Sequence, residues 1–378
     1  LWGPDSQLRS TVSSGSGRSS VKPLKAADAV AIDLFAGAGG LSLGLRSSGF
    51  TIGAALDNDP IASETYRRNI GDHIACASIE EVSATDLMKR AGVLRGECTL
   101  LTGGPPCQGF SLQRRGSRID VRNELVLQFV RMVEDIHPRF FLMENVGGLL
   151  TKHGKIFLDE FGRRAARLGY VIHVELLNAA DFGVPQHRRR AFLVGERCES
   201  RASMFRFPAR QSGFRHRTVR DAIGDLPSPP LDGSCHPNYE NHYRERRLSA
   251  INVERIQHFP QGGGREILPP HLQLNCHKNN LNHRHLDVYG RLSWAEPSVT
   301  LTARFDSFTR GRFAHPVEHR SITIREGARI QTFPDFFTFS GNREDQARQV
   351  GNAVPPVLAE RLGEALLSAI SMPGILAA

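Results

Sequence analysis

The segment Ala29-Val-Ala-Ile-Asp-Leu-Phe-Ala-Gly-Ala-Gly-Gly40 decides the fold that the sequence predicts. Its first seven residues form a short apolar run typical of a buried strand, and the glycines that follow are typical of a tight turn. Leu41, Leu43 and Leu45 then begin a helical pattern. A strand, a glycine turn and a helix together are typical of a nucleotide-type cofactor site. Glycines let the backbone approach a ligand, and the helix N-terminus favours anionic groups.

Polar side chains follow three of the predicted strands. Asp57 follows Thr51-Ile-Gly-Ala-Ala-Leu56, about 20 residues beyond the glycine turn, where such folds bind a ribose diol. Glu144 follows Phe140-Phe-Leu-Met143, and Cys107 follows a third apolar stretch. The carboxyl ends of parallel strands share one edge of a doubly wound sheet, so these side chains are expected to form one site. The glycine spacing is not GxGxxG, which disfavours a nicotinamide-dependent dehydrogenase.

The segment Leu101-Thr-Gly-Gly-Pro-Pro-Cys-Gln-Gly-Phe-Ser111 presents a single thiol on a rigid loop. Pro105 and Pro106 have fixed φ angles and cannot donate to a strand ladder, so the strand ends before Cys107. Rigid loops at the ends of strands carry reactive groups in many α/β folds. A buried structural cysteine would fit this segment alone equally well, since most cysteines are inert.

Composition places the chain among globular proteins large enough for two domains. It has 378 residues, of which 40% are hydrophobic and 23% charged, which allows a large core. The six cysteines form no CxxC pair, which argues against a disulfide scaffold and fits a reducing cytosol. Cys235-His236 and Cys276-His277, with His283 and His285 beyond, match no standard zinc spacing, so no metal is expected. No apolar run approaches the length of a transmembrane helix.

Positive charge is concentrated in the second half of the chain. The formal net charge is +9, and residues 199–320 hold 17 arginines and one lysine against 12 acidic residues. Arginine makes bidentate contacts to phosphates and guanine edges, so this excess favours a nucleic-acid partner. A basic surface without such a partner is the alternative.

The remaining patterns predict an α/β domain around an irregular region. Helices are expected over 60–69, 124–135, 323–332 and 357–370, strands over 170–178 and 191–194, and a Gly/Pro turn over 349–356. Residues 1–27 are predicted to be a disordered extension, and residues 114–123 a mobile loop. From about residue 200 to residue 310, Pro, Gly, His and Arg replace periodic patterns, which predicts a small, loop-rich second domain.

The motifs, taken in order, resemble the DNA (cytosine-5) methyltransferase family of bacterial restriction-modification systems. The matching segments are Asp33-Leu-Phe-Ala-Gly-Ala-Gly-Gly40, Gly103-Gly-Pro-Pro-Cys-Gln-Gly-Phe-Ser111, Glu144-Asn-Val146, Gln186-x-Arg188-x-Arg190, Arg325-Glu-Gly-Ala-Arg329 with Gln331-Thr-Phe-Pro334, and Gly351-Asn-Ala-Val-Pro-Pro356. The resemblance implies an α/β fold: a Rossmann-like, S-adenosylmethionine-dependent methyltransferase sheet with a smaller, loop-rich target recognition domain. It implies S-adenosyl-L-methionine as the cofactor and a flipped-out cytosine in double-stranded DNA as the substrate.

The chemistry implied by this family explains the residue types. Carbon 5 of cytosine is a poor nucleophile and lies inside the base stack. Addition of a thiolate to carbon 6 makes carbon 5 enamine-like, so the resemblance makes Cys107 the nucleophile. Glu144 matches the acid at ring nitrogen 3, which offsets the developing negative charge. Arg190 matches the arginine at the cytosine 2-oxygen, and Arg188 matches an arginine near the thiol and phosphate.

The resemblance also assigns a donor pocket. The residues expected to contact the donor are Phe35, Gly37, Gly39, Gly40, Leu41, Asp57, Asn58, Ser78, Ile79, Pro106, Asn352 and Val354. Phe35 is expected against the adenine. Asp57 is expected at the ribose, although the family usually has Glu there. Ser78 and Ile79 stand where an Asp usually contacts the adenine amino group.

The basic region corresponds to the family's target recognition part, and DNA contacts are expected from Gln108, Ser111, Arg188, Thr300 and Arg304. The predicted domains are a catalytic and cofactor-binding domain over 28–198 plus 345–378 and a target recognition domain over 199–344. The resemblance implies a monomer in the bacterial cytoplasm that protects DNA from a cognate restriction endonuclease, a partner by function only.

Two other functions remain open. One is a tRNA cytosine-5 methyltransferase of the same fold, against which the long basic region argues. The other is a non-catalytic DNA-binding homologue, against which the presence of Cys107, Glu144 and Arg190 argues.

Overall fold

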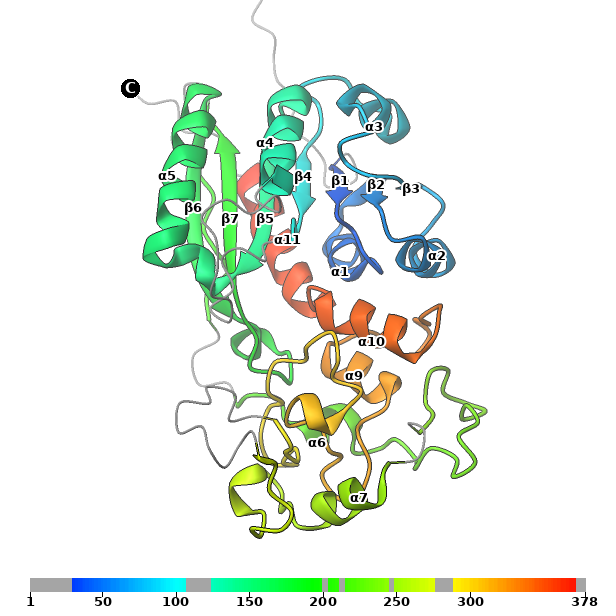
Figure 1. Cartoon of the computed structure of the whole chain (residues 1–378). Coiled ribbons are helices and arrows are strands. Elements are labelled where there is room, and N and C mark those ends of the chain that lie inside the picture. Colours follow the sequence, from blue (N-terminus) through cyan, green and yellow to red (C-terminus); the bar gives the residue numbers. More distant parts are fainter. Residues whose placement is uncertain are drawn as a thin grey trace, which may run out of the picture.

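A seven-stranded sheet forms the centre of the protein (Figure 1). The computed structural model describes residues 29–106, 124–198, 203–210, 215–244, 248–275 and 288–371. The strands are β1 (Val30–Leu34), β2 (Thr51–Asp57), β3 (Ile74–Cys76), β4 (Leu100–Gly103), β5 (Phe140–Val146), β6 (Tyr170–Asn178) and β7 (Arg189–Arg197). Their order across the sheet is β3-β2-β1-β4-β5-β7-β6. Neighbours are parallel, except that β7 runs antiparallel to β5 and β6.

Helices cover both faces of the sheet, because successive strand residues point to opposite faces. Phe140 and Leu142 of β5 pack on one face with α1 (Gly40–Ser48) and α11 (Pro356–Ser371). Phe141 and Met143 pack on the other face. The helices on that face are α3 (Ala84–Ala91), α4 (Glu124–Ile136) and α5 (Lys152–Arg167). The sheet is therefore the middle of three layers, as the Rossmann-like prediction requires.

Helix α2 (Pro60–Asn69) follows β2 and packs at the β3 end of the sheet. Pro60 suits its first turn, and the N-cap Asp59 accepts hydrogen bonds from the backbone amides of Ile61 and Ala62. Tyr66 of this helix is buried with Ala55 of β2 in a small cluster. Helix α2 thus begins near the carboxyl end of β2 and packs against β3, the strand at the edge of the sheet.

Helices α1 and α11 lie in contact because each has a glycine at the crossing. A Cβ on Gly44 of α1 would overlap the Pro356 carbonyl oxygen, and a Cβ on Gly363 of α11 would overlap the Ser48 hydroxyl. Only glycine permits such a close backbone approach. The C-terminal helix is therefore packed directly on the helix that begins at the glycine turn.

The part of the chain between β7 and α10 (Arg343–Asn352) is mostly irregular where the structure describes it, and it lies below the sheet in Figure 1. Its helices are α6 (Val219–Ile223), α7 (Ala250–Gln257) and α9 (Ile324–Ile330). Short 3-10 helices within the described residues are η4 (Gly147–Leu150), η5 (Ala179–Phe182), η6 (Arg265–Ile267) and η7 (Phe308–Arg310). A separate hydrophobic cluster that includes Phe305, Phe313 and Phe337 forms the core of this part. We call residues 203–342 the recognition region, after the domain predicted there; its role and its exact boundaries stay predictions.

The predicted elements agree with this fold, with one correction. The predicted turn over 349–356 is wrong in its first half, because α10 continues through Asn352. Gly351 is needed because the helix approaches the Thr302 carbonyl, which a Cβ would overlap. The sequence patterns do not predict β3, α3 or α5. The expected extension over 1–27 and loop over 114–123 lie outside the described residues. No helix in the described ranges is long and apolar enough to cross a membrane.

Candidate active site

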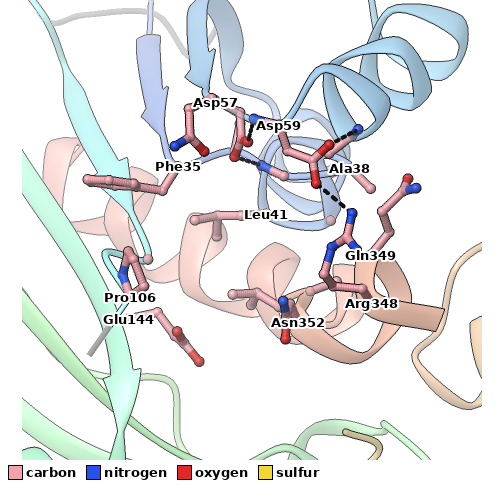
Figure 2. Close-up of a pocket in the computed structure, with 18 residues that line it drawn as sticks. Phe35, Ala38, Leu41, Asp57, Asp59, Pro106, Glu144, Arg348, Gln349 and Asn352 are labelled. Atoms are coloured by element: carbon pink, nitrogen blue, oxygen red, sulfur yellow. Dashed lines mark hydrogen bonds and ion pairs between the residues drawn. The ribbon is translucent and has the colours of Figure 1, made fainter. Parts of the chain in front are cut away.

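A cavity of about 300 Å³ lies at the carboxyl ends of β1, β2, β4 and β5 (Figure 2). Its size is typical of a small-molecule site. The lining residues are Phe35, Ala36, Gly37, Ala38, Gly40, Leu41, Asp57, Asn58, Asp59, Ala62, Gly104, Pro106, Glu144, Arg348, Gln349, Asn352, Ala353 and Val354. The cavity thus joins the first two strands, the β4 and β5 ends, and the segment at the end of α10.

The turn between β1 and α1 forms one wall of this cavity. Phe35 has a φ of 56° and Gly37 a φ of 55°, and non-glycine residues rarely adopt such angles outside constrained sites. A Cβ on Gly37 would meet no atom within 4 Å, because this residue faces the open cavity. Gly39 has a φ of 95° and caps α1. It faces Tyr66 rather than the cavity.

Asp57 is held at the end of β2 by two backbone amides. Its Oδ2 accepts a hydrogen bond of 2.7 Å from Gly37, and its Oδ1 accepts one of 2.8 Å from Asp59. Each carboxylate oxygen keeps a lone pair for another donor. Burial is the main cause that raises the pKa of this carboxyl group. The sequence therefore predicts correctly that this acid stands beside the glycine turn.

A second acid, Asp33, is buried beneath the same turn and does not line the cavity. Its Oδ2 accepts a hydrogen bond of 2.6 Å from Ser42, whose hydroxyl lies 3.0 Å from the Tyr66 hydroxyl. The Tyr66 hydroxyl lies 2.9 Å from His73 Nε2. Burial raises the pKa of Asp33 to about 7. This network fixes the start of α1 from behind.

Glu144 and Arg190 form an ion pair at the β5 side of the cavity. Arg190 Nε lies 3.0 Å from Glu144 Oε1, with side chains that are 19% and 13% exposed. The antiparallel pairing of β5 and β7 explains this contact, because Val146 stands opposite Arg190 in the register. The resemblance predicts both residues in one site, and the structure brings them together.

The β4 end is tied to the same strand. The Asn145 side-chain amide donates a hydrogen bond of 3.2 Å to the Pro105 carbonyl, so the Glu144-Asn-Val146 segment holds the proline loop. A Cβ on Gly104 would lie 3.4 Å from Glu144 Oε2. Pro106 lines the cavity. Cys107, Gln108 and Ser111 follow it in the sequence and lie outside the described residues.

Arg188 is 2% exposed, and its hydrogen-bond partners among the described residues are backbone carbonyls. Its Nη1 donates to the carbonyls of Leu301, at 3.1 Å, and Gly351, at 3.0 Å. Burial lowers the pKa of this guanidinium to about 9, so it stays charged at neutral pH. Arg188, the residue before β7, thus joins the start of that strand to both the recognition region and α10. Its expected contacts with the thiol and with phosphate stay predictions.

The expected DNA contacts Thr300 and Arg304 both have protein partners. The Thr300 hydroxyl donates a hydrogen bond of 2.7 Å to the His187 carbonyl. Arg304 lies 3.4 Å from an Asp306 oxygen and 3.2 Å from a Glu344 oxygen. A contact with DNA would compete with these interactions, and it stays a prediction.

The structure also changes the expected donor site. Ser78 and Ile79 do not line the cavity; Ile79 is buried in the core under α3 and α4, and the Ser78 hydroxyl bonds to Glu80. A match by sequence position alone could not show this. Asp59 and Arg348 line the cavity although the sequence analysis does not select them. Arg348 stands one helical turn before Asn352, which is the only local signal for it.

Several arginines of the basic region are internal. Arg255, Arg291 and Arg320 are at most 6% exposed. Arg291 donates to the carbonyls of Phe259, Ile256 and Glu318, at 2.7, 2.8 and 2.8 Å. No group of three or more His, Cys, Asp or Glu side chains within the described ranges could hold a metal.

Known proteins of one family are similar to this chain over most of its length. The model of the C-5 cytosine-specific DNA methylase family matches residues 30–368. The Type II methylase M.HgiDII of Herpetosiphon aurantiacus is 33% identical over 340 residues, which cover 89% of this chain and 94% of that protein. The Type II methyltransferase M.XorII of Xanthomonas oryzae pv. oryzae is 34% identical over 369 residues, which cover 90% of this chain and 85% of that protein.

Solved structures agree with the fold. One, from E. coli, is described as a DNA modification methyltransferase encoded within a prophage. It has a TM-score of 0.64 and 25% identity, and the match covers 91% of this chain and all of that one. The S. pombe Dnmt2 methyltransferase has a TM-score of 0.61 at 18% identity, over 90% of this chain and 98% of that one, which shows the fold alone. Taken with the family match over nearly the whole chain, these likenesses show that the chain belongs to the C-5 cytosine-specific DNA methylase family and is a DNA cytosine-5 methyltransferase of the bacterial restriction-modification type.

Proposed function

We propose that this methyltransferase methylates a flipped-out cytosine in a specific duplex DNA sequence, with S-adenosylmethionine as donor and a covalent Cys107 adduct as intermediate. One observation carries the proposal. Glu144, paired with Arg190 at 3.0 Å, lines the same cavity as Phe35, Asp57 and the glycine turn. The carboxyl group proposed to contact the cytosine and the residues proposed to contact the adenosine of the donor therefore line one cavity.

The residues of the cavity fit the donor. Gly37 leaves room for a ligand against its backbone, and Asp57 keeps one lone pair on each oxygen for a ribose diol. Phe35 lines the cavity and offers an aromatic face to an adenine. The donor, when bound, supplies an electrophilic methyl group. The amino-terminal end of α1 favours an anionic group on the ligand.

The protein residues make the cytosine nucleophilic. The Cys107 thiolate adds to carbon 6, and the electron pair of the carbon 5–carbon 6 double bond shifts toward nitrogen 3. Glu144 donates a hydrogen bond or proton to nitrogen 3 and so offsets that charge. Arg190 orients the Glu144 carboxyl group through their ion pair. After carbon 5 is methylated, its proton leaves to water and the thiolate is eliminated, which restores the aromatic ring.

The substrate is proposed to be duplex DNA, with protection from a cognate endonuclease as the role in the cell. Exposed arginines of the recognition region, such as Arg310, can neutralise phosphates. The cytosine must leave the stack before the thiol can reach it. A monomer is proposed because one chain supplies every residue named above.

A trapping experiment tests this proposal. A duplex with 5-fluorocytosine at the target site should give an SDS-resistant complex in the presence of donor, because fluorine at carbon 5 cannot leave as a proton does. Cys107→Ser should give no complex and no methylated DNA while still binding duplex. Cys76→Ser is the matched control, because this exposed thiol lies outside the cavity, and it should behave as the wild type.

Two results would contradict the proposal. One is a covalent adduct formed by Cys107→Ser. The other is that the wild type forms no adduct with 5-fluorocytosine placed at any site that it methylates. The target site is found beforehand by bisulfite sequencing of DNA from cells that express the chain. Methyl transfer to tRNA but not to duplex would replace the DNA proposal with the tRNA alternative.

A further inference from the structure

The cavity has two ends, and the proposed chemistry uses only one of them. Figure 2 shows Phe35, Pro106 and Glu144 on one side and Asp59 and Arg348 on the other, with Leu41 between them. The first side holds the groups for the nucleoside and the cytosine. The far side carries an ion pair for which the steps above have no use.

The geometry of this ion pair is well defined. Arg348 Nη2 lies 2.9 Å from Asp59 Oδ2 and 3.0 Å from Asp345 Oδ1. The other Asp59 oxygen accepts hydrogen bonds of 2.9 and 3.2 Å from the amides of Ile61 and Ala62. Both ion-pair side chains remain partly exposed, at 42% for Arg348 and 28% for Asp59. Opposite charges are thus fixed side by side in the cavity wall, with surface left for a ligand.

The start of α1 lies in the same wall. Gly40 and Leu41 line the cavity, and the N-cap Gly39 has no side chain with which to accept the first amides of the helix. Such amides carry partial positive charge and favour an anionic ligand group. Gly40 and Leu41 line the same cavity as Asp57, where the ribose is proposed, and as Arg348. An anion at this position would meet the helix terminus and a guanidinium together.

We propose that Asp59 and Arg348 bind the amino-acid end of the donor, with Arg348 at its α-carboxylate and Asp59 at its α-ammonium group. The inference rests on the proposed use of S-adenosylmethionine. That end of the donor is a zwitterion, and the ion pair presents the complementary charges. Arg348 is then a binding residue for donors that carry an amino-acid group. A purely structural role, in which the ion pair only fastens α10 to α2, is the competing explanation.

Two ligands separate these explanations. S-adenosylhomocysteine carries the amino-acid end, whereas 5′-methylthioadenosine has the same adenosine and a thioether without that end. Affinities of both are measured by calorimetry for the full-length wild type, Arg348→Met and Arg348→Lys. Arg361→Met is the matched control, since Arg361 is 40% exposed and paired with an acid, Glu364, on α11 outside the cavity.

Arg348→Met should weaken S-adenosylhomocysteine by about 10- to 100-fold, the range expected when a hydrogen bond to a charged group is lost. The affinity for 5′-methylthioadenosine should stay unchanged, which also shows that the variant is folded. Arg348→Lys should recover part of the loss, and Arg361→Met should change neither affinity. In turnover, Arg348→Met should raise the KM for the donor and leave kcat near the wild-type value.

Equal losses for both ligands would overturn the inference in favour of the structural role, and so would unchanged affinity for both. If the wild type binds 5′-methylthioadenosine but Arg348→Met shows no selective loss, the inference fails while the donor assignment stands. Failure of the wild type to bind S-adenosylhomocysteine would overturn the donor assignment itself.

Discussion

The cavity at the sheet edge and the recognition region solve the same problem in different ways. Backbone groups of the sheet are paired in strand ladders, so polar side chains at the strand ends are left for a ligand. In the recognition region few ladders exist, and arginine side chains pair with the backbone carbonyls instead. Arg291 has carbonyl partners in two separate stretches of this region, Ile256 and Phe259 in one and Glu318 in the other. Arg325, on α9, donates to the carbonyls of Glu240, Pro334 and Phe337.

Because arginines of the recognition region pair with backbone carbonyls, the excess of arginine there does not measure the charge available to DNA. The excess of arginine over residues 199–320 predicts contacts with nucleic acid, yet Arg255, Arg291 and Arg320 are buried. Arg320 is also paired with the buried Glu326 at 2.8 Å. These arginines hold the irregular chain together and are not available to phosphates. Charge counted along a sequence therefore overestimates the charge that faces DNA in a region without regular structure.

The largest effect is expected at the sheet edge, where one side chain, Glu144, is proposed to take part in the chemistry. Glu144→Gln should lower turnover by about 10²- to 10⁴-fold, the usual contribution of a general acid or base. Binding of S-adenosylhomocysteine and of duplex should persist, because glutamine has the same size and its amide oxygen can still accept a hydrogen bond from Arg190. Methyl transfer is measured under single-turnover conditions. Glu160→Gln on α5, far from the cavity, is the control. Near-normal turnover by Glu144→Gln would remove the acid from the mechanism.

The next effect tests whether buried arginines hold the recognition region. Arg291→Met leaves several buried carbonyls without a donor, which should cost at least about 3 kcal/mol of local stability. Hydrogen exchange should rise over 248–275 and 288–322, while the amides of β1 and β4 stay protected. The exposed Arg310→Met should leave exchange unchanged and reduce the salt dependence of duplex binding. If Arg291→Met raises hydrogen exchange of the β1 and β4 amides to the same extent, the two regions unfold as one cooperative unit. The buried arginines would then not stabilise the recognition region separately from the sheet.

A smaller effect is expected from the acid beneath the glycine turn. Burial raises the pKa of Asp33 to about 7, whereas the unfolded value is about 3.9. Between these values the folded state holds more protons, so the free energy of unfolding falls as pH rises, by up to about 1.4 kcal/mol per pH unit. This contribution levels off above pH 7.

Asp33→Asn should remove that slope. Measured against the wild type at the same pH, the free energy of unfolding of the variant should therefore be more positive at pH 8 than at pH 5. Urea midpoints between pH 5 and pH 8 measure the change, and Asp72→Asn, whose side chain is 93% exposed, is the control. An unchanged pH dependence in Asp33→Asn would show that the Asp33 carboxyl group is already charged at pH 5.

The smallest effect separates backbone strain from ligand contact. Gly37→Ala should cost about 1 kcal/mol, because alanine is disfavoured at a left-handed φ. Gly92→Ala is matched to it, since Gly92 also has a positive φ and its Cβ would also meet nothing within 4 Å. Both variants should lose similar thermal stability, but only Gly37→Ala should bind S-adenosylhomocysteine more weakly. Equal donor affinity in the two variants would remove Gly37 from the binding wall.

Local patterns predict the sheet and half of the site. The apolar run and glycines of residues 29–40, and the acids Asp57 and Glu144 at strand ends, are visible without the structure. β3 is too short to show an alternating pattern, and Gly351 suggests a turn although it serves a close helix contact. Arg348 resembles every other arginine of the chain, and only long-range packing places it at the cavity.

The contact between α1 and α11 has a consequence for the order of synthesis. One wall of the cavity at the sheet edge comes from residues 35–62, and the facing wall comes from residues 348–354, which α11 anchors against α1. The ribosome makes the first wall long before the second. A nascent or truncated chain that ends before α10 has the β1 turn and Glu144 but lacks half of the cavity. Under the proposed function such a product lacks part of the donor site, so methylation requires translation to have passed α11.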